Sequence, residues 1–137
     1  MWRFIHALPP HYVASKLGAS DAIVLDGKLD DDAWAAAAWT GRMVDITHHD
    51  SASENAVPDD LQARAKLRWD DRYLYVGVEL REPLIIANVT GHNTPTPPYK
   101  DNDFEVFVDP SGTTQFYKEF EVTANAPPFP PPPPPEP

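Results

Sequence analysis

The chain has 137 residues and a formal net charge of -10, from 21 acidic and 11 basic side chains. This charge disfavours binding to nucleic acid or to an anionic membrane surface, because either partner would repel the protein. The chain contains no cysteine, which excludes disulfide bonds and thiolate chemistry. Its length suits one domain, so we expect a single domain. From the charge we expect no nucleic-acid or membrane partner.

Both ends of the chain differ in character from its middle. Residues 127–137 are nine prolines with one Phe and one Glu, a composition that favours polyproline II and packs into no sheet. We expect a proline-rich disordered tail there. Near the N-terminus, Pro9 and Pro10 interrupt the apolar residues before a signal-peptide core could form. No export signal is visible, and the compartment stays unknown.

The first third of the chain predicts little regular structure apart from one helix. Short apolar runs at 11–14 and 22–25 are candidates for brief strands. Residues 30–39 predict a short helix, because aspartates stand in its first turn and alanines, the best helix formers, fill its middle. Leu29 and Trp34 have the spacing of a hydrophobic staple, which sets the angle at which the chain enters a helix.

Two strands with strict alternation form the clearest pattern in the chain. Residues 63–69 place apolar side chains at odd positions and basic ones at even positions, and residues 74–81 place aliphatic side chains at every even position. The short connection at 70–72 predicts an antiparallel hairpin. Its inward face is expected to hold Leu67, Trp69, Leu74, Val76, Val78 and Leu80.

A second hairpin is predicted after a long loop. In residues 103–109 the alternation separates an apolar face from a face that carries carboxylates. A turn at 109–112, with Pro at its second position and Gly at its fourth, leads into another alternating strand at 116–123. Tyr99 stands just before the first of these strands, at the end of a proline-containing loop. The second hairpin is therefore preceded by a polar loop that carries an aromatic side chain.

These elements predict a mainly β fold with one short helix near the N-terminus. Half-buried alternating strands need a second sheet to cover their apolar face, which favours an antiparallel β-sandwich of the immunoglobulin or jelly-roll kind. The expected organisation is a sandwich domain over residues 11–126, followed by the proline-rich tail at 127–137.

The acids of the second hairpin allow an enzymatic interpretation. Glycoside hydrolysis uses paired carboxylates, and adjacent strands here offer Glu105, Asp109, Glu119 and Glu121. Acids on an outward strand face are more often simply solvated, and in so acidic a chain we take this as the default. We therefore expect no enzyme activity and no catalytic residue.

Metal binding is weakly indicated in two places. His48 and His49 are adjacent and would face opposite sides of a strand, so an ordinary loop is the better interpretation. Hard oxygen ligands for a structural calcium ion are offered by Asp101, Asn102, Asp103 and Asp109. The glycine-punctuated loop of common calcium sites is absent, so we expect no cofactor, with this calcium site as the alternative.

An aromatic side chain flanked by hydrogen-bonding groups suits a sugar, whose ring has an apolar face and a polar edge. Four stretches, in order along the chain, together resemble the family 9 carbohydrate-binding modules. They are residues 25–30 with Trp34 and Trp39, residues 69–76, residues 101–110 and residues 116–122. The resemblance covers about residues 11–126.

This resemblance implies a noncatalytic module that binds a polysaccharide or oligosaccharide, often beside a glycoside hydrolase in carbohydrate catabolism and often outside the cell. In the family a sugar lies between two aromatic rings, of which the first corresponds to Tyr99. A strand glutamate that binds sugar hydroxyls corresponds to Glu105, and a sugar-binding arginine of some members is replaced by Glu121. The predicted ligand-binding residues are Tyr99, Asp103, Glu105 and Glu121.

The family pattern continues for several strands beyond Asn125, and the second aromatic ring belongs to that part. Residues 127–137 stand there in this chain, so the predicted domain is incomplete and its apolar faces are expected to lack part of the opposing sheet. An alternative function is an interaction protein whose tail recruits a polyproline-reading domain, with the β domain as a scaffold.

Overall fold

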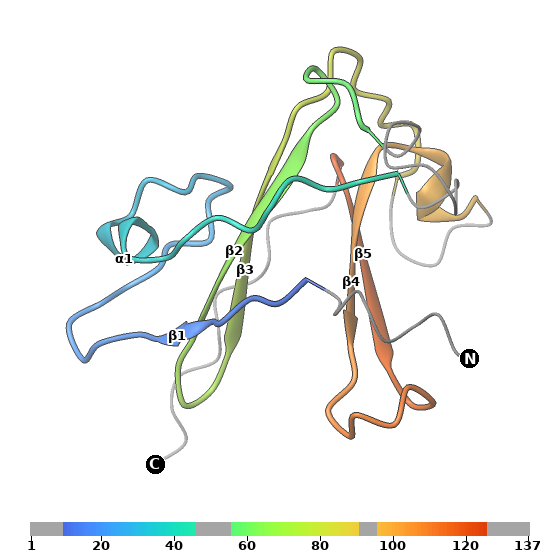
Figure 1. Ribbon diagram of the computed structural model, residues 1–137. Coiled ribbons are helices and arrows are strands. Elements are labelled where there is room, and N and C mark those ends of the chain that lie inside the picture. Colours follow the sequence, from blue (N-terminus) through green and yellow to red (C-terminus); the bar gives the residue numbers. More distant parts are fainter. Residues whose placement is uncertain (1–9, 46–55, 91–95, 126–137) are drawn as a thin grey trace. The chain divides into compact units, whose positions relative to one another are not determined.

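The structure is a computed structural model that describes residues 10–45, 56–90 and 96–125 (Figure 1). It divides into two compact units, Met1–Glu82 (unit 1) and Pro83–Pro137 (unit 2), and each is described by itself. Among the described residues, no helix has the length and apolar character needed to cross a membrane.

Unit 1 is built on a three-stranded sheet of mixed direction. β2 (Ala63–Trp69) and β3 (Leu74–Leu80) form the predicted antiparallel hairpin, which confirms that prediction. The two-residue strand β1 (Ser15–Lys16) pairs in parallel with the other edge of β2. The hairpin is therefore the scaffold on which the rest of unit 1 is laid (Figure 1).

An aspartate closes the loop between β2 and β3. The Asp70 carboxylate accepts hydrogen bonds from the amides of Arg72 and Tyr73, both at 2.7 Å, and from the Tyr75 hydroxyl at 2.8 Å. The Arg72 amide bond, followed by the Tyr75 bond, lowers the pKa of Asp70. Burial, with the same hydrogen bond, raises the pKa of Tyr75 to about 12. The predicted short connection is thus held by one side chain.

The N-terminal segment follows the edge of β2 without forming the expected strands. No strand forms at 11–14 or at 22–25, which corrects both predictions. The Tyr12 hydroxyl instead donates to the Ala38 carbonyl (2.6 Å) and accepts from the Leu67 amide (3.2 Å). A side chain thereby satisfies a strand-edge amide that a paired strand would otherwise bind.

The predicted helix is shorter than its alanine content suggests. α1 spans Asp32–Ala35, so only the first part of the helix expected over 30–39 forms. Asp31 is the N-cap residue but makes no capping bond, because its carboxylate accepts from the Val24 amide (3.1 Å). A helix this short is not stable alone, so α1 depends on the packing of its side chains.

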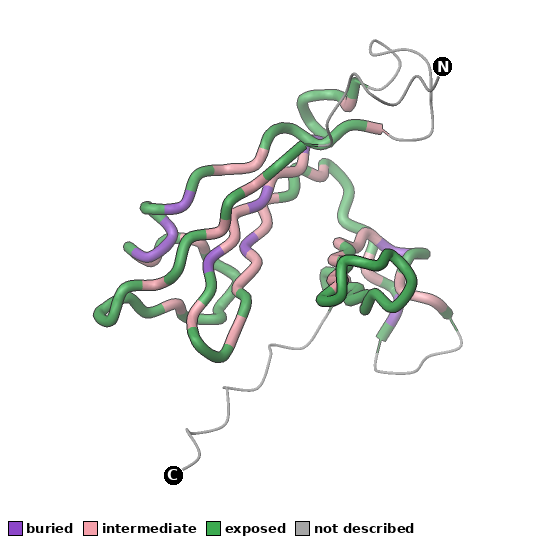
Figure 2. The backbone as a smooth tube through the Cα atoms, turned by 60° about the horizontal axis from the view of Figure 1, so that its bottom comes forward, coloured by how far each residue is buried: buried purple, intermediate pink, exposed green. Residues whose placement is uncertain are grey.

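That packing covers the face of the hairpin that was expected to point outward. Trp34 is 2% exposed, and a Cβ built on Gly77 would lie 3.1 Å from the Trp34 ring and 2.6 Å from the Leu29 side chain. The predicted inward face is more open, with exposed fractions of 39% for Trp69, 49% for Leu74 and 48% for Leu80. Figure 2 shows buried residues in α1 and along the hairpin. The expected inward face is therefore not the one that the helix packs against.

Unit 2 holds a two-stranded antiparallel sheet. β4 (Asp103–Val108) pairs with β5 (Lys118–Thr123), and Glu105 lies directly opposite Glu121. A single 3-10 turn, η2 (Pro98–Lys100), precedes β4. The second hairpin is confirmed, although β5 begins two residues later than predicted.

The chain is thus mainly β, with two small sheets and one short α-helix. The described residues contain no closed sandwich or barrel, so the predicted sandwich is confirmed only as far as its strands. The apolar face of the β4–β5 sheet is partly open, with Phe120 57% and Val122 37% exposed. Each sheet therefore has exposed apolar side chains among its described residues.

Candidate functional site

The start of β4 is tied to the segment that follows unit 1. The Asn102 carboxamide oxygen accepts from the Ile86 amide (2.6 Å), and the Asn102 amide donates to the Ile86 carbonyl (3.0 Å). The Asp101 carboxylate accepts from the Val89 amide (2.6 Å), and both residues are buried. These bonds fix the chain immediately before Asp103, the first residue of the strand.

Three of the four predicted ligand-binding residues come together on one face of the β4–β5 sheet. Asp103 and Glu105 are two residues apart on β4 and so share a face, and Glu121 is the cross-strand partner of Glu105. Each offers a carboxylate oxygen, and these three oxygens lie within 4.8 Å of one another. Such hard oxygen atoms can accept hydrogen bonds from hydroxyl groups or hold a cation.

Asp103 is the least exposed of the three acids. Its Oδ2 atom is buried and has no hydrogen-bond partner among the described residues, whereas Glu105 and Glu121 are exposed. Burial raises the pKa of Asp103 above its usual range. The ionised carboxylate at this position is therefore less well stabilised than it would be in water, and a donor placed there would stabilise it.

This raised pKa predicts a pH-dependent gain from replacing Asp103 by asparagine. A carboxyl whose pKa is raised by folding stabilises the fold below its unfolded pKa, and this contribution is lost as pH rises through the folded pKa. Near pH 7, Asp103→Asn should raise the unfolding free energy by less than about 1 kcal/mol, because solvent screens a partly exposed charge.

Urea unfolding at about pH 7 and at about pH 3 measures this effect, and the gain should vanish at the lower pH. Glu119→Gln, an exposed acid of β5, is the control and should change little at either pH. A lower midpoint for Asp103→Asn at neutral pH would contradict the argument.

Tyr99, the fourth predicted residue, stands in the turn before β4. Its side chain is 60% exposed, and the Lys100 ammonium group lies 5.3 Å from the centre of its ring. The η2 turn that carries Tyr99 contacts β5, the strand that bears Glu121. The ring is therefore available for stacking at the end of the sheet where the three carboxylates gather.

An aromatic pair on the same face was not identified from the sequence. Phe107 lies two residues beyond Glu105, and its ring centre is 5.5 Å from that of Tyr117, with exposed fractions of 55% and 50%. Period-two alternation places Phe107 on the carboxylate face, but its contact with Tyr117 depends on the strand register. The carboxylate face thus also carries an exposed aromatic residue, Phe107, next to its acids.

An exposed aromatic ring beside hydrogen-bonding carboxylates is the arrangement that stacks on and hydrogen-bonds a sugar ring. Residues 25–125 match the carbohydrate family 9 binding domain-like family. The chain belongs to this family. Family 9-like domains bind carbohydrate and are typically noncatalytic, which agrees with an open face of this kind. No curated protein and no solved structure matches the chain.

The family 9-like domain does not bring the predicted calcium ligands together. Asp109 follows β4, at the opposite end of the strand from Asp101, and accepts from the Ser111 hydroxyl (2.7 Å) and the Thr114 amide (2.6 Å), which lower its pKa. Asp101 and Asn102 bind backbone amides, as described above. The length of β4 thus separates Asp109 from the other three candidates, so the four do not form one ligand set. His48 and His49 lie outside the described residues.

Proposed function

We propose that residues 11–126 form a noncatalytic domain that binds a polysaccharide or oligosaccharide on the carboxylate face of the β4–β5 sheet. The sugar ring stacks on Tyr99, and its hydroxyl groups donate to Asp103, Glu105 and Glu121. The observation that supports this proposal is the convergence of the three carboxylates, within 4.8 Å, on a strand pair whose strand β5 contacts the turn that carries the exposed Tyr99. Association with a glycoside hydrolase in carbohydrate catabolism is part of the same proposal.

The exposed apolar faces of the two hairpins support the prediction of a β-sandwich. Each sheet has alternating strands and an open apolar face, with Leu74 on one and Phe120 on the other among the exposed residues. An open apolar sheet face is stabilised when a second layer removes it from water. We therefore keep the antiparallel β-sandwich as the proposed architecture of residues 11–126. The predicted tail at 127–137 lies outside the described residues, so its predicted binding to a polyproline-reading domain stays a prediction.

Titration calorimetry tests the binding proposal on the full chain. Soluble glucans, xylans and cello-oligosaccharides at millimolar concentration should release or absorb heat with at least one ligand. Tyr99→Ala should weaken that binding by about tenfold or more, because it removes the stacking surface. Glu105→Gln should also weaken it, because a carboxylate is a stronger acceptor than an amide.

Phe116→Ala is the matched control for Tyr99→Ala. Phe116 is an aromatic residue of unit 2 that is 75% exposed and lies outside the proposed site. It should leave affinity unchanged. The proposal would be rejected by an absence of heat with every sugar from a folded sample, or by equal losses for the two aromatic variants.

A further inference from the structure

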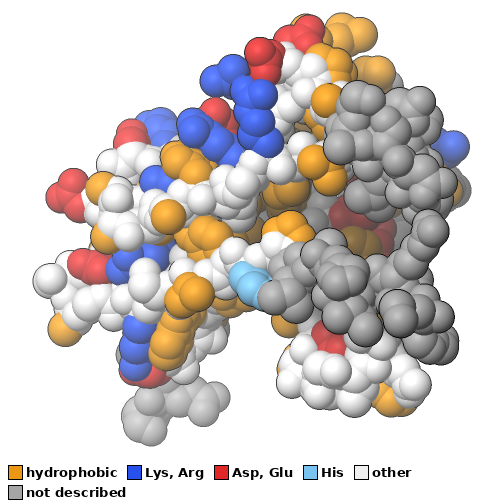
Figure 3. Space-filling view, in the orientation of Figure 1, with side chains coloured by type: hydrophobic (Ala, Val, Ile, Leu, Met, Phe, Trp, Pro, Cys, Tyr) orange, Lys and Arg blue, Asp and Glu red, His pale blue; other side chains and the backbone are white. Residues whose placement is uncertain are grey.

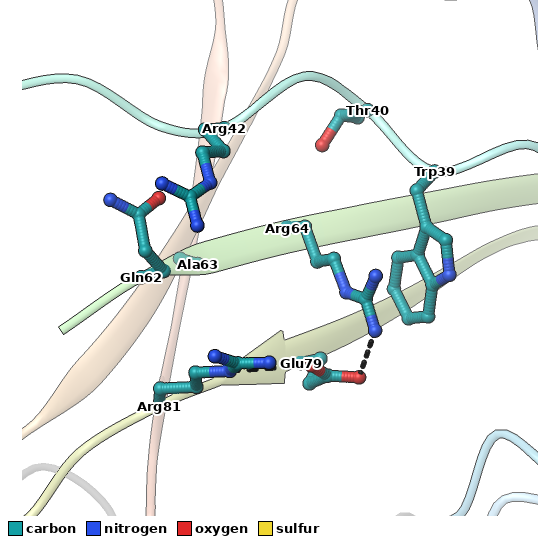
Figure 4. Close-up of a pocket in the computed structure, with 8 residues that line it drawn as sticks. All are labelled: Trp39, Thr40, Arg42, Gln62, Ala63, Arg64, Glu79 and Arg81. Carbon is teal, nitrogen blue, oxygen red and sulfur yellow. Dashed lines mark hydrogen bonds and ion pairs between the residues drawn. The ribbon is translucent and has the colours of Figure 1, made fainter. Parts of the chain in front are cut away.

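Unit 1 contains a cavity whose aromatic side chain is already covered by cations of the same chain. The cavity has a volume of about 190 Å³, and its lining residues include Trp39, Arg42, Arg64, Glu79 and Arg81 (Figure 4). The Arg64 guanidinium lies 4.0 Å from the centre of the Trp39 ring and 2.7 Å from the Glu79 carboxylate. Lys and Arg side chains gather on this part of unit 1 (Figure 3). The indole is therefore held by cation–π contacts within the chain.

Unit 2 differs, because an aromatic pair there is open to solvent. Phe107 and Tyr117 are 55% and 50% exposed, and their ring centres lie 5.5 Å apart with 59° between the ring planes. Tilted pairs at this distance attract each other, so each ring restricts the motion of the other. Among the residues that the structure describes, no Lys or Arg side chain lies over either ring. The pair is therefore available for stacking on a ligand.

The strand register places this pair on the face that carries the acids. Phe107 follows Glu105 by two residues on β4, and its cross-strand partner is Glu119 of β5. Tyr117 precedes Glu119 by two residues, so it continues the same face just before β5 begins. The ring contact agrees with this placement, because Phe107 and Tyr117 are diagonal neighbours across the strand pair. The face thus changes from acids at the start of β4 to aromatic rings at its end.

Hydrogen bonds fix the loop that joins β4 to Tyr117. This loop lies at the opposite end of the hairpin from η2 (Figure 1). The Asp109 carboxylate accepts from the Ser111 amide (3.1 Å) and from the Thr114 amide (2.6 Å). Thr114 has a φ of 63°, a left-handed conformation that a β-branched residue rarely adopts, and its bound amide helps to hold it there. The aromatic pair is therefore positioned before a ligand arrives, which lowers the cost of ordering it on binding.

The acids and the aromatic pair are too far apart for one sugar ring. Asp103 and Phe107 are four residues apart on β4, which corresponds to about 13 Å in a strand. A pyranose ring that donates to Asp103 and Glu105 is too short to cover Phe107 as well. A chain of linked sugars repeats an apolar ring face and a polar edge, so one ring can meet the acids and a later ring the aromatic pair.

The charge of this face selects against anionic sugars. Four acids lie on it, namely Asp103, Glu105, Glu119 and Glu121. The cation of β5, Lys118, lies opposite Val108 and so belongs to the other face of the sheet. A ligand with carboxylate or sulfate groups would be repelled by these acids, whereas hydroxyl groups can donate to them. The matching ligand is therefore an uncharged chain.

We propose that the carboxylate face of the β4–β5 sheet binds an extended segment of a neutral polysaccharide, with Phe107 and Tyr117 as a second stacking subsite. One sugar ring donates to the acids, and a later ring of the same chain stacks on the aromatic pair. This inference rests on the proposed carbohydrate function, to which it adds a minimum ligand length and a preference for uncharged chains.

Calorimetric titration of the full chain with cello- and xylo-oligosaccharides, from disaccharide to hexasaccharide, tests the length requirement. Affinity should rise by about tenfold or more once the ligand is long enough to reach Phe107, because a second ring then stacks. Phe107→Ala and Tyr117→Ala should each remove this gain and leave disaccharide affinity unchanged. Tyr99→Ala should weaken binding of both lengths. Oligogalacturonates of the same lengths should not bind, because they are anionic.

Phe120→Ala is the matched control for Phe107→Ala. It removes the same side chain, at a similar exposure of 57%, from the opposite face of the same sheet. It should leave the affinity for every ligand length unchanged. Phe107 and Tyr117 are about half exposed, so their alanine variants should fold, which circular dichroism checks.

Several results would overturn this inference. Equal affinity for the disaccharide and the hexasaccharide would remove the second subsite while leaving sugar binding in place. Equal losses for Phe107→Ala and Phe120→Ala would show that the effect is not specific to this face. Oligogalacturonate binding as tight as that of the neutral ladder would contradict the preference for uncharged chains.

A second copy of the chain is the competing occupant of the aromatic pair. Sedimentation would then show a concentration-dependent dimer that Phe107→Ala abolishes, with unchanged hexasaccharide affinity, and this result would also overturn the inference. An absence of binding at every ligand length would reject the proposed carbohydrate function together with it.

Discussion

Replacing Trp34 by alanine is expected to lower the unfolding free energy by about 3–5 kcal/mol, the usual cost of removing a buried aromatic side chain. Trp34 is 2% exposed, and the other buried apolar residues described in unit 1 are the alanines at 33, 37 and 65. Alanines cannot reach into the space that the indole leaves. The loss would be a large part of a typical stability of about 5–15 kcal/mol.

Urea unfolding followed by far-UV circular dichroism measures this loss without relying on the fluorescence of the removed residue. Trp69→Ala is the matched control, because that indole is 39% exposed and lies on the open face of the hairpin. It should cost well under half as much. Similar losses for the two variants would contradict the assignment of Trp34 as the centre of the packing in unit 1.

Valine in place of Gly77 is expected to destabilise unit 1 by about 1–3 kcal/mol or more. The first added carbon would already lie 2.6 Å from Leu29 Cδ2 and 3.1 and 3.3 Å from two atoms of the Trp34 ring. Intrinsic strand preference predicts the opposite sign, because valine favours strands and glycine does not. The measured sign therefore separates local preference from tertiary packing.

Gly41→Val is the control for this substitution, since a Cβ at Gly41 would meet no atom within 4 Å. Its effect should stay within about 0.5 kcal/mol. Thermal and urea midpoints of both variants provide the comparison, and the cost at Gly77 should shrink in a chain that also carries Trp34→Ala. A raised midpoint for Gly77→Val would mean that Leu29 and Trp34 do not cover β3.

Both hairpins could be predicted because their signals are local. The alternation at 63–69 and 103–109 repeats every two residues, and turn-forming polar residues follow each of these strands. Asp70 shows why the first turn forms, since one carboxylate binds two amides and a hydroxyl within five residues. The length of the helix predicted at 30–39 was overestimated, because alanine propensity alone contributes little free energy. Only the turn that contains the packed Trp34 is helical.

The candidate site in unit 2 was also largely visible in the sequence. Asp103, Glu105 and Tyr99 lie within seven residues of one another, so their nearness needs little more than a strand and a turn. The place of Glu121 opposite Glu105 needed the register of β4 with β5. The cavity lined by Arg42, Arg64 and Arg81 in unit 1 was not predictable, because Arg42 joins the hairpin only through the bonds of the Thr40 and Met43 amides to the Ala65 and Ala63 carbonyls of β2.

The sequence alone determined that this protein is mainly β, that it has two hairpins, and that a tyrosine precedes the carboxylate-bearing strand of the second one. Alternation shows that a strand has two different faces, but it does not show which one another segment covers. Only the tertiary structure decided that Leu29 and Trp34 cover the basic face at Gly77. The reason is that Gly77 leaves room for an indole, and the contact joins residues more than forty positions apart.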